Sequence, residues 1–224
     1  MTSPKMATPE PDIKQVFFRL WRKLNRVRSR FTAFRSADYW ETRYATGGNS
    51  GSGSYGQLAH YKAQILNEFV SRYNVNSVVE FGCGDGHQLS LSQYPKYVGI
   101  DVSVTAVKRC SSLFNADQSK TFLLATDNAA QSERADLAIS LDVIYHLVED
   151  EIYETYMRSL FSAANRFVII YSDNRESGDR SSLHVRHRKF SDWAPSHQPE
   201  WQLIEHIPNQ LGSWSDFWIY AKSC

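Results

Sequence analysis

Apolar and polar positions follow two alternating patterns through most of the chain. Short runs rich in Val, Ile, Leu and Phe, typical of buried strands, are separated by segments in which apolar residues recur every three or four positions, as in amphipathic helices. This alternation predicts right-handed βαβ units and a parallel sheet. The predicted strands are the run that opens at Val78, then 97–101, 121–127, 135–142 and 166–171, and the predicted helices are 36–44, 57–73, 104–114 and 149–164.

The end of the chain departs from this alternation. Two further runs, 201–206 and 216–220, are separated by a loop that contains Pro, Asn and Gly, with no helical pattern between them. Such a pair is typical of antiparallel strands.

A glycine-rich turn follows the first predicted strand. Residues 78–86 read Val-Val-Glu-Phe-Gly-Cys-Gly-Asp-Gly, which places the turn at the C-terminal edge of the sheet, where open α/β sheets bind nucleotide-like ligands. Glycine lets the backbone take positive φ and approach a ligand closely. The dinucleotide fingerprint would need a third glycine at position 87, which is His87, and the turn has no basic residue for a pyrophosphate. NAD and ATP are therefore disfavoured.

A second acidic residue stands at the expected distance. Asp101 ends the run 97–101, 21 residues after Glu80, and this is the spacing of a ribose-binding carboxylate. The same side chain could instead cap the helix that starts near Ser103. The two roles are compatible.

These residues resemble motif I of the class I S-adenosylmethionine-dependent methyltransferases, in which an acidic residue stands two positions before a G-x-G-x-G turn. The matching residues are Glu80, Gly82, Gly84 and Gly86. The resemblance implies an α/β, Rossmann-like sheet of seven mostly parallel strands, with the last strand antiparallel and helices on both faces. It implies S-adenosylmethionine as cofactor, S-adenosylhomocysteine as product, and cofactor contacts from Glu80, Gly82, Cys83, Gly84, Asp101, Val102, Asp127 and Leu141.

Residues 36–56 are expected to form a lid. Residues 36–44 predict a short helix with Ser36 as N-cap, and residues 47–56 are rich enough in Gly and Ser to pass for a flexible linker. Because this stretch lies between aromatic-bearing segments, we favour a lid loop over a linker. The arrangement resembles a bacterial methyltransferase subgroup and implies Trp40, Arg43, Tyr44 and Tyr55 as lid residues, with Arg43 able to pair with the cofactor's carboxylate.

The candidate base is His146. S-adenosylmethionine carries an activated methyl group, so an enzyme mainly aligns the nucleophile, but a hydroxyl nucleophile, with a pKa of about 15.7, makes a general base or a metal important. His146 follows the fourth predicted strand, where this superfamily places substrate-facing residues. Asp142 stands four residues earlier and would orient the imidazole if the turn is helical. The alternative is a histidine that only hydrogen-bonds near the cofactor.

A second basic cluster, residues 184–189, follows the fifth strand after a polar stretch. His184, Arg186 and Arg188 are candidates for binding an anionic acceptor, and His187 is a further catalytic candidate. Alternatively, the two histidines could hold a divalent metal with Asp142 and His146, although no further acid stands at tight spacing. A merely solvated basic loop is the third alternative. We predict no metal.

Bulk properties indicate one globular domain of 224 residues, 42% of them apolar. No run is long enough for a membrane span and no secretory signal is evident, so we expect a cytoplasmic protein. Three cysteines are scattered without metal or redox spacing. Cys83 is expected to pack as a small residue under the glycine turn.

The N-terminal segment differs in charge from the rest of the chain. Residues 13–35 carry +8 with no acid, so the remainder carries −7 against an overall +1. Apolar residues recur there at steps of three and four, which predicts an amphipathic basic helix. The helix could attach to an anionic membrane surface on the inner face, or its stripe could dock on the protein's own core or a second subunit; docking is the commoner case. We therefore expect a tail and basic helix over 1–35 and a methyltransferase domain over 36–224.

The leading functional prediction is O-methylation of a small polar or glycan-type acceptor. The alternatives are an N- or carboxyl-methyltransferase acting on a small molecule, a protein or RNA, and a non-catalytic cofactor-binding scaffold. RNA is disfavoured because the basic residues are confined to one helix and one loop. The intact Glu80, Gly82, Gly84 and Asp101 argue against a scaffold.

Overall fold

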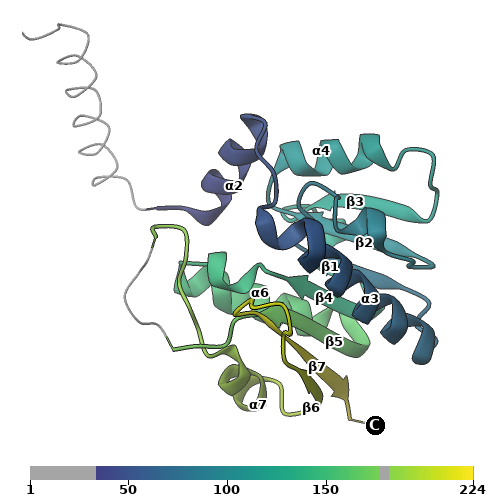
Figure 1. Cartoon of the computed structure of the whole chain (residues 1–224), viewed down its shortest axis with the longest axis vertical. Helices are drawn as coiled ribbons and strands as arrows, with labels where there is room; N and C mark the ends of the chain where they lie inside the picture. Colours follow the sequence, from purple (N-terminus) through teal and green to yellow (C-terminus); the bar gives the residue numbers. More distant parts are fainter. Residues whose placement is uncertain (1–33, 177–181, 224) are drawn as a thin grey trace, which may run out of the picture. The chain divides into compact units, whose positions relative to one another are not determined.

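A single seven-stranded sheet organises the chain from Arg35 onward (Figure 1). The computed structural model describes residues 34–176 and 182–223. The predicted basic helix over 13–35 lies almost wholly outside them, and its membrane or protein partner stays a prediction. The strands are β1 (Val78–Phe81), β2 (Tyr97–Asp101), β3 (Lys120–Leu124), β4 (Ala135–Leu141), β5 (Ala164–Ser172), β6 (Trp201–Ile207) and β7 (Asp216–Lys222).

The strand order is β3-β2-β1-β4-β5-β7-β6. Strands β1 to β5 pair in parallel, whereas β7 lies antiparallel between β5 and β6. The predicted sheet, with its reversed last strand, is confirmed. The order reverses between β1 and β4, which is the point where ligands bind in open α/β sheets.

Helices cover both faces of the sheet (Figure 1). Alternate residues of β1 point to opposite faces: Val78 packs in a cluster with Leu66 and Phe69, whereas Val79 packs in a cluster with Met157. All four residues of β1 are buried for this reason. The helices are α2 (Ser36–Ala45), α3 (Gly56–Arg72), α4 (Val104–Leu113), α5 (Asn128–Ser132), α6 (Asp150–Ser162) and α7 (Trp193–His197), with short 3-10 turns that include η1 (Ser52–Ser54) and η3 (Ile144–His146).

At two element ends, a side-chain hydrogen bond explains why the structure differs from the sequence prediction. Strand β3 ends at Leu124 rather than at Asp127, because the Asp127 carboxylate accepts a hydrogen bond from the Leu124 N–H and closes a turn. Ser36 is the first residue of α2 rather than its N-cap, a position that Arg35 takes without a side-chain bond. The Ser36 hydroxyl instead bonds to Glu149.

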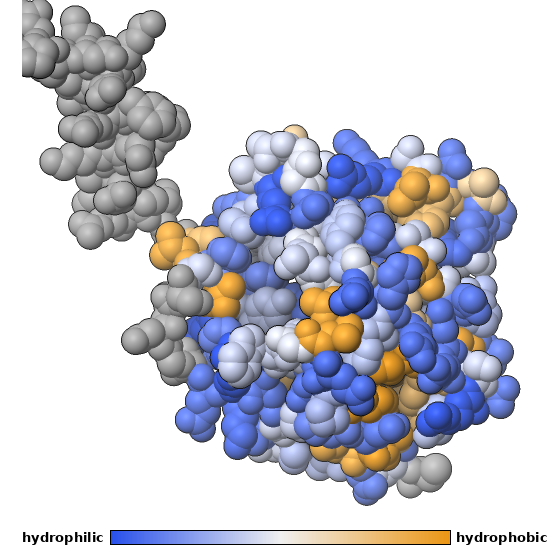
Figure 2. Space-filling model, viewed as in Figure 1, coloured by the Kyte–Doolittle hydropathy of each residue, from blue (hydrophilic) through white to orange (hydrophobic). Residues whose placement is uncertain are grey.

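Polar residues dominate the face drawn in Figure 2, where apolar side chains form small separate groups. Within the described residues, no helix has both the length and the apolar character needed to cross a membrane.

Candidate active site

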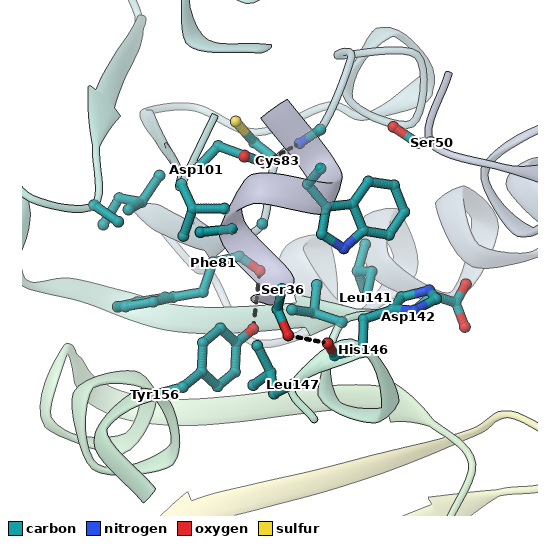
Figure 3. Close-up of a pocket in the computed structure, with 18 of the residues that line it drawn as sticks. Ser36, Ser50, Phe81, Cys83, Asp101, Leu141, Asp142, His146, Leu147 and Tyr156 are labelled. Carbon is teal, nitrogen blue, oxygen red and sulfur yellow. Dashed lines mark hydrogen bonds between the residues drawn. The ribbon is translucent and has the colours of Figure 1, made fainter. Parts of the chain in front are cut away.

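A pocket of about 220 Å³ opens at the C-terminal edge of the sheet. Its walls come from the glycine turn after β1, the ends of β2 and β4, the η3 turn and helix α2. Figure 3 shows Asp101 toward one end of the pocket and Asp142 with His146 toward the other. The pocket therefore spans the two halves of the sheet at the reversal of strand order.

The turn after β1 requires its glycines. Gly82 and Gly84 have φ values of +85° and +58°, a region that residues with side chains rarely adopt. A Cβ on Gly82 would lie 2.5 Å from Val143 Cγ2, and one on Gly84 would lie 2.3 Å from Ser50 Oγ. The backbone thus forms a floor onto which no side chain can be added without displacing a neighbour.

Asp101 holds this turn in place. Its carboxylate accepts hydrogen bonds from the Gly84 N–H at 2.9 Å and from the Ser103 N–H at 2.9 Å. Burial raises the pKa of Asp101, against the effect of these backbone bonds. The N-cap of α4 is Ser103, whose hydroxyl accepts from the Ala106 N–H, so Asp101 does not cap the helix. Asp101 lines the pocket, and its ribose role stays a prediction.

Two further polar side chains face the pocket beside the turn. Glu80 is buried and accepts a hydrogen bond from the Tyr97 hydroxyl at 2.6 Å, and burial raises its pKa to about 7. Gln88 donates to the Ala59 carbonyl, while its Oε1 atom is buried and has no partner among the described residues. Both side chains can accept hydrogen bonds from a ligand. Gln88 is absent from the sequence prediction, since a single Gln after the turn carries no pattern.

Helix α2 crosses the pocket and is anchored on both sides of it. The Ser36 N–H and hydroxyl bond to the Glu149 carboxylate at 2.8 and 2.5 Å. The Glu41 carboxylate accepts bonds from Ser103 Oγ at 2.6 Å and Thr105 Oγ1 at 2.6 Å. One end of α2 is thus tied to the start of α6 and the middle to the start of α4.

The predicted lid residues divide into two groups. Trp40 and Tyr44 line the pocket. Arg43 lies outside the lining residues, because its guanidinium donates to the Asn49 carbonyl at 2.6 Å. Tyr55 is also outside, and its hydroxyl donates to Asp85 at 2.8 Å. The structure thus shows Arg43 holding the Gly/Ser loop rather than facing the pocket.

The Gly/Ser loop is fastened to the glycine turn. The Ser50 N–H donates to the Asp85 carboxylate at 2.8 Å, and the Asp85 N–H donates to Ser50 Oγ at 3.0 Å. Ser50 and Ser54 line the pocket. A Cβ on Gly53 would come within 2.9 Å of the Asp142 carboxylate. The loop therefore contacts both the turn and the far end of the pocket, as a lid would.

Asp142 lies at that far end, directly after β4, with a φ of +59°. Its carboxylate accepts bonds from Lys62 Nζ at 2.8 Å and Ser215 Oγ at 2.9 Å. A non-glycine residue in this conformation is held by its surroundings, and such positions cluster at functional sites. Lys62 is fully buried on α3, and the sequence prediction missed it. A lysine on an otherwise apolar helix face is the signal that marks it.

His146 lines the pocket on the η3 turn. Its Nδ1 lies 2.9 Å from the His184 carbonyl, which can only accept, so Nδ1 carries the proton and Nε2 keeps its lone pair. Burial lowers its pKa to about 4, so the imidazole is neutral at pH 7. The turn is a 3-10 turn, and the His184 carbonyl rather than Asp142 is the partner of Nδ1.

None of the residues 184–189, the predicted substrate-binding loop, lines the pocket. Arg186 and Arg188 pair with Asp150 at 3.0 and 2.7 Å. The ring of His184 stacks on Tyr39. His187 bonds through Nδ1 to Asp173, away from His146. An anionic acceptor would therefore compete with Asp150 for both arginines.

The predicted cofactor contact of Asp127 and the alternative metal set lack support in this geometry. Asp127 is not among the pocket residues, and Ala125 takes a place in the lining there. Across residues 34–176 and 182–223, no three or more His, Cys, Asp or Glu side chains come together as metal ligands. The alternative metal set of Asp142, His146, His184 and His187 is therefore not assembled.

A family model described as a methyltransferase domain matches residues 55–211. The chain belongs to this methyltransferase family. The match covers the glycine turn, Asp101, Asp142 and His146, so it includes most of the pocket described above. Among curated proteins, no sequence matches this methyltransferase.

Solved structures share its fold. Magnesium protoporphyrin IX methyltransferase (ChlM) from Synechocystis PCC 6803 with bound SAM is 16% identical, with a TM-score of 0.62 over 86% of this chain and 99% of that chain. N-methyltransferase NodS from Bradyrhizobium japonicum WM9 with S-adenosyl-L-homocysteine is 15% identical, with a TM-score of 0.63 over 84% and 99%. The methyltransferase domain of bacterial CtHen1-C is 18% identical, with a TM-score of 0.57 over 75% and 100%.

Proposed function

We propose that this methyltransferase uses S-adenosylmethionine to methylate a hydroxyl group of a small polar or glycan-type acceptor, with His146 as the proton acceptor. The observation that carries the proposal is the state of His146: a neutral imidazole in the pocket, with its proton fixed on Nδ1 and the lone pair of Nε2 free for a substrate proton. An amine acceptor would need no such base.

The pocket fits this cofactor. The glycine turn leaves no room for a Cβ, and Asp101 stands at the end of β2. The buried Oε1 of Gln88 has no hydrogen-bond donor among the described residues. The ammonium group of S-adenosylmethionine offers such a donor to Gln88 and Glu80, and its ribose hydroxyls offer donors to Asp101. Structural neighbours solved with this cofactor or its product support the assignment.

The protein's own task is positioning and proton transfer. When bound, S-adenosylmethionine supplies a methyl group whose bond to sulfur breaks as the acceptor oxygen attacks. His146 Nε2 then receives the hydroxyl proton, which becomes strongly acidic as the oxygen acquires its third bond. A base with a pKa of about 4 is sufficient for that late transfer. Trp40 and Tyr44 of α2 line the pocket and add apolar and aromatic surface around the bound cofactor.

The test is transfer of labelled methyl from S-adenosylmethionine into separated lipid, glycan, protein, RNA and small-metabolite fractions of the host extract. Label in a glycan, lipid-linked glycan or small-metabolite fraction, as a base-stable methyl ether, supports the proposal. Label on nitrogen, on a carboxyl group, in protein or in RNA overturns it. Cofactor binding without any label would instead favour the scaffold alternative.

A further inference from the structure

A buried carboxylate lies beside the pocket and is not used by the function proposed above. Asp173 directly follows β5 and is 4% exposed. Its neighbour across the sheet edge is Asp142, whose N–H donates to the Tyr171 carbonyl of β5 at 2.7 Å. The two aspartates thus stand at the C-terminal ends of adjacent parallel strands, at the edge where such sheets bind their ligands.

The two oxygens of Asp173 differ. Oδ2 accepts from His187 Nδ1 and from Arg175 Nη2, the latter at 3.0 Å. Oδ1 is buried and has no hydrogen-bond partner within the described residues. A desolvated carboxylate oxygen without a donor is costly to the fold. Such an atom in a native structure calls for an explanation, and a ligand that donates to it is one.

Asp173 is connected to the pocket by Tyr145. The hydroxyl of Tyr145, on the η3 turn, lies near Asp142, which lines the pocket. Asp142 and Asp173 both act on this hydroxyl electrostatically, and together with burial they raise its pKa. Tyr145 therefore lies near both carboxylates. Asp173 itself lies outside the pocket lining, at the strand end next to that of Asp142.

An aromatic side chain stands at the rim of the same region. Trp214, in the loop between β6 and β7, is 74% exposed. Its ring lies 4.6 Å from the guanidinium of Arg175, and the next residue, Ser215, bonds to Asp142. Arg175 is the exposed partner in the cluster, with 43% of its side chain accessible, so a shift of this flexible side chain that keeps its bond to Oδ2 would open Oδ1 of Asp173 to a ligand.

The chemistry of the ligand follows from these groups. A carboxylate oxygen only accepts, so the ligand must donate, as a hydroxyl does. An exposed tryptophan offers a flat apolar surface. The nearby charges are paired, Asp173 with Arg175 and Asp142 with Lys62, which favours a neutral ligand. A sugar ring combines hydroxyl donors with an apolar face and no charge.

We propose that Asp173 and Trp214 form an acceptor subsite for a neutral sugar, in which Asp173 Oδ1 receives a hydrogen bond from a sugar hydroxyl and Trp214 covers the apolar face of the ring. The subsite rests on the proposed function and narrows its acceptor class. His187 is a positioning residue for Asp173 in this subsite.

Binding can be measured without turnover. Saturation-transfer NMR on the full chain with S-adenosylhomocysteine would use methyl glycosides of neutral hexoses as probes. We expect saturation of ring protons with the wild type, its loss in Asp173→Ala and Trp214→Ala, and its retention in Trp214→Phe and in the distant control Asp117→Asn. No saturation with the wild type, or equal saturation in every variant, would overturn the subsite.

Kinetics separate the subsite from the proposed function. With labelled S-adenosylmethionine and the fraction that the wild type labels, Asp173→Asn should raise the apparent KM for that fraction at least about tenfold, while cofactor Kd stays within about twofold. An unchanged KM refutes the subsite whichever fraction is labelled. A cofactor Kd that weakens as much as activity would make Asp173 structural. Nitrogen or RNA labelling by the wild type would refute the proposed function on its own.

Discussion

The ammonium of Lys62 lies 2.8 Å from the carboxylate of Asp142, in a pair whose lysine side chain has no exposed surface. This contact joins helix α3 to the end of β4 and holds Asp142 in its left-handed conformation. A fully buried lysine without its partner is unfavourable, so each member of the pair depends on the other.

Replacement of Lys62 by Met should therefore destabilise the fold by about 3 kcal/mol, because it leaves Asp142 charged and uncompensated. Urea denaturation measures the loss. The double variant Lys62→Met, Asp142→Asn should recover a large part of it, and Lys108→Met, at an exposed position on α4, serves as the control. The single variant Asp142→Asn completes the cycle, and a double variant that lost as much stability as the two single variants together would show that the residues are not coupled.

His146→Ala should lower turnover by about 10²-fold or more and change cofactor Kd little, because the base acts on the acceptor proton. Rapid-quench measurement of one turnover gives the chemical rate, and calorimetry gives the Kd. His197→Ala, on α7, is a matched control outside the pocket. A rate within a factor of a few of the wild type would remove His146 from the mechanism.

The depressed pKa of His146 also makes a prediction about stability. Its folded pKa is about 4 against an ordinary 6.5, so between these pH values the unfolded chain binds the proton more readily. Stability from this residue is present above pH 6.5 and is lost as pH falls toward 4, by up to about 3 kcal/mol. As the pH is lowered from 6.5 to 4, the urea midpoint should fall less steeply for His146→Phe than for the wild type. Identical slopes of urea midpoint against pH in the two proteins would show that the fold does not lower the pKa of His146.

The raised pKa of Glu80 leads to the prediction that cofactor binding releases a proton from this carboxyl group. Burial raises its pKa to about 7, and the positive charge of S-adenosylmethionine in the same pocket favours the ionised carboxylate. Cofactor affinity should therefore rise as pH increases toward 7, and more for S-adenosylmethionine than for S-adenosylhomocysteine, which lacks the sulfonium. Calorimetry at pH 6.5 in buffers of different ionisation enthalpy detects the proton, and Glu80→Gln should abolish the release. Equal heats in all buffers would contradict the prediction.

Asp101→Ala should weaken cofactor binding by about 1–3 kcal/mol through loss of charge-assisted hydrogen bonds. Asp127→Ala is the matched comparison, because the sequence predicts both acids at a strand end but only Asp101 lines the pocket. The cofactor Kd of Asp127→Ala should stay within about twofold of the wild-type value. An unchanged Kd for Asp101→Ala would refute the ribose role, and a large effect of Asp127→Ala would restore the sequence prediction for that residue.

The contrast between these two aspartates shows where sequence reasoning succeeds. Asp101 could be predicted because strand, spacing and glycine turn are all local patterns. Asp127 was misplaced at a strand end because its bond to Leu124 closes a turn that apolar content does not reveal. The N-cap prediction for Ser36 was wrong for another reason: its partner, Glu149, lies 113 residues away.

The far side of the pocket was less predictable than the cofactor side. His146 and Asp142 were identified by their position after β4, but their partners come from distant segments: His184 for one, Lys62 and Ser215 for the other. Asp173 and Trp214 carry no motif, and only the folded chain brings Trp214 close to Arg175, the sequence neighbour of Asp173. Acceptor sites of this kind are assembled from loops, whose geometry the sequence pattern does not encode.

The two anchors of α2 bear on the speed of the whole cycle. A spent nucleoside thioether beneath Trp40 and Tyr44 would leave when contacts such as Ser36 to Glu149 and Glu41 to Ser103 open, because these contacts hold the helix that lines the pocket. Such openings occur in microseconds to milliseconds and often limit enzymes of this kind. The steady-state rate would then be the rate of product release, and a burst of methylated product would precede it. Selection for a faster enzyme would act on these anchors before it acted on the chemical step.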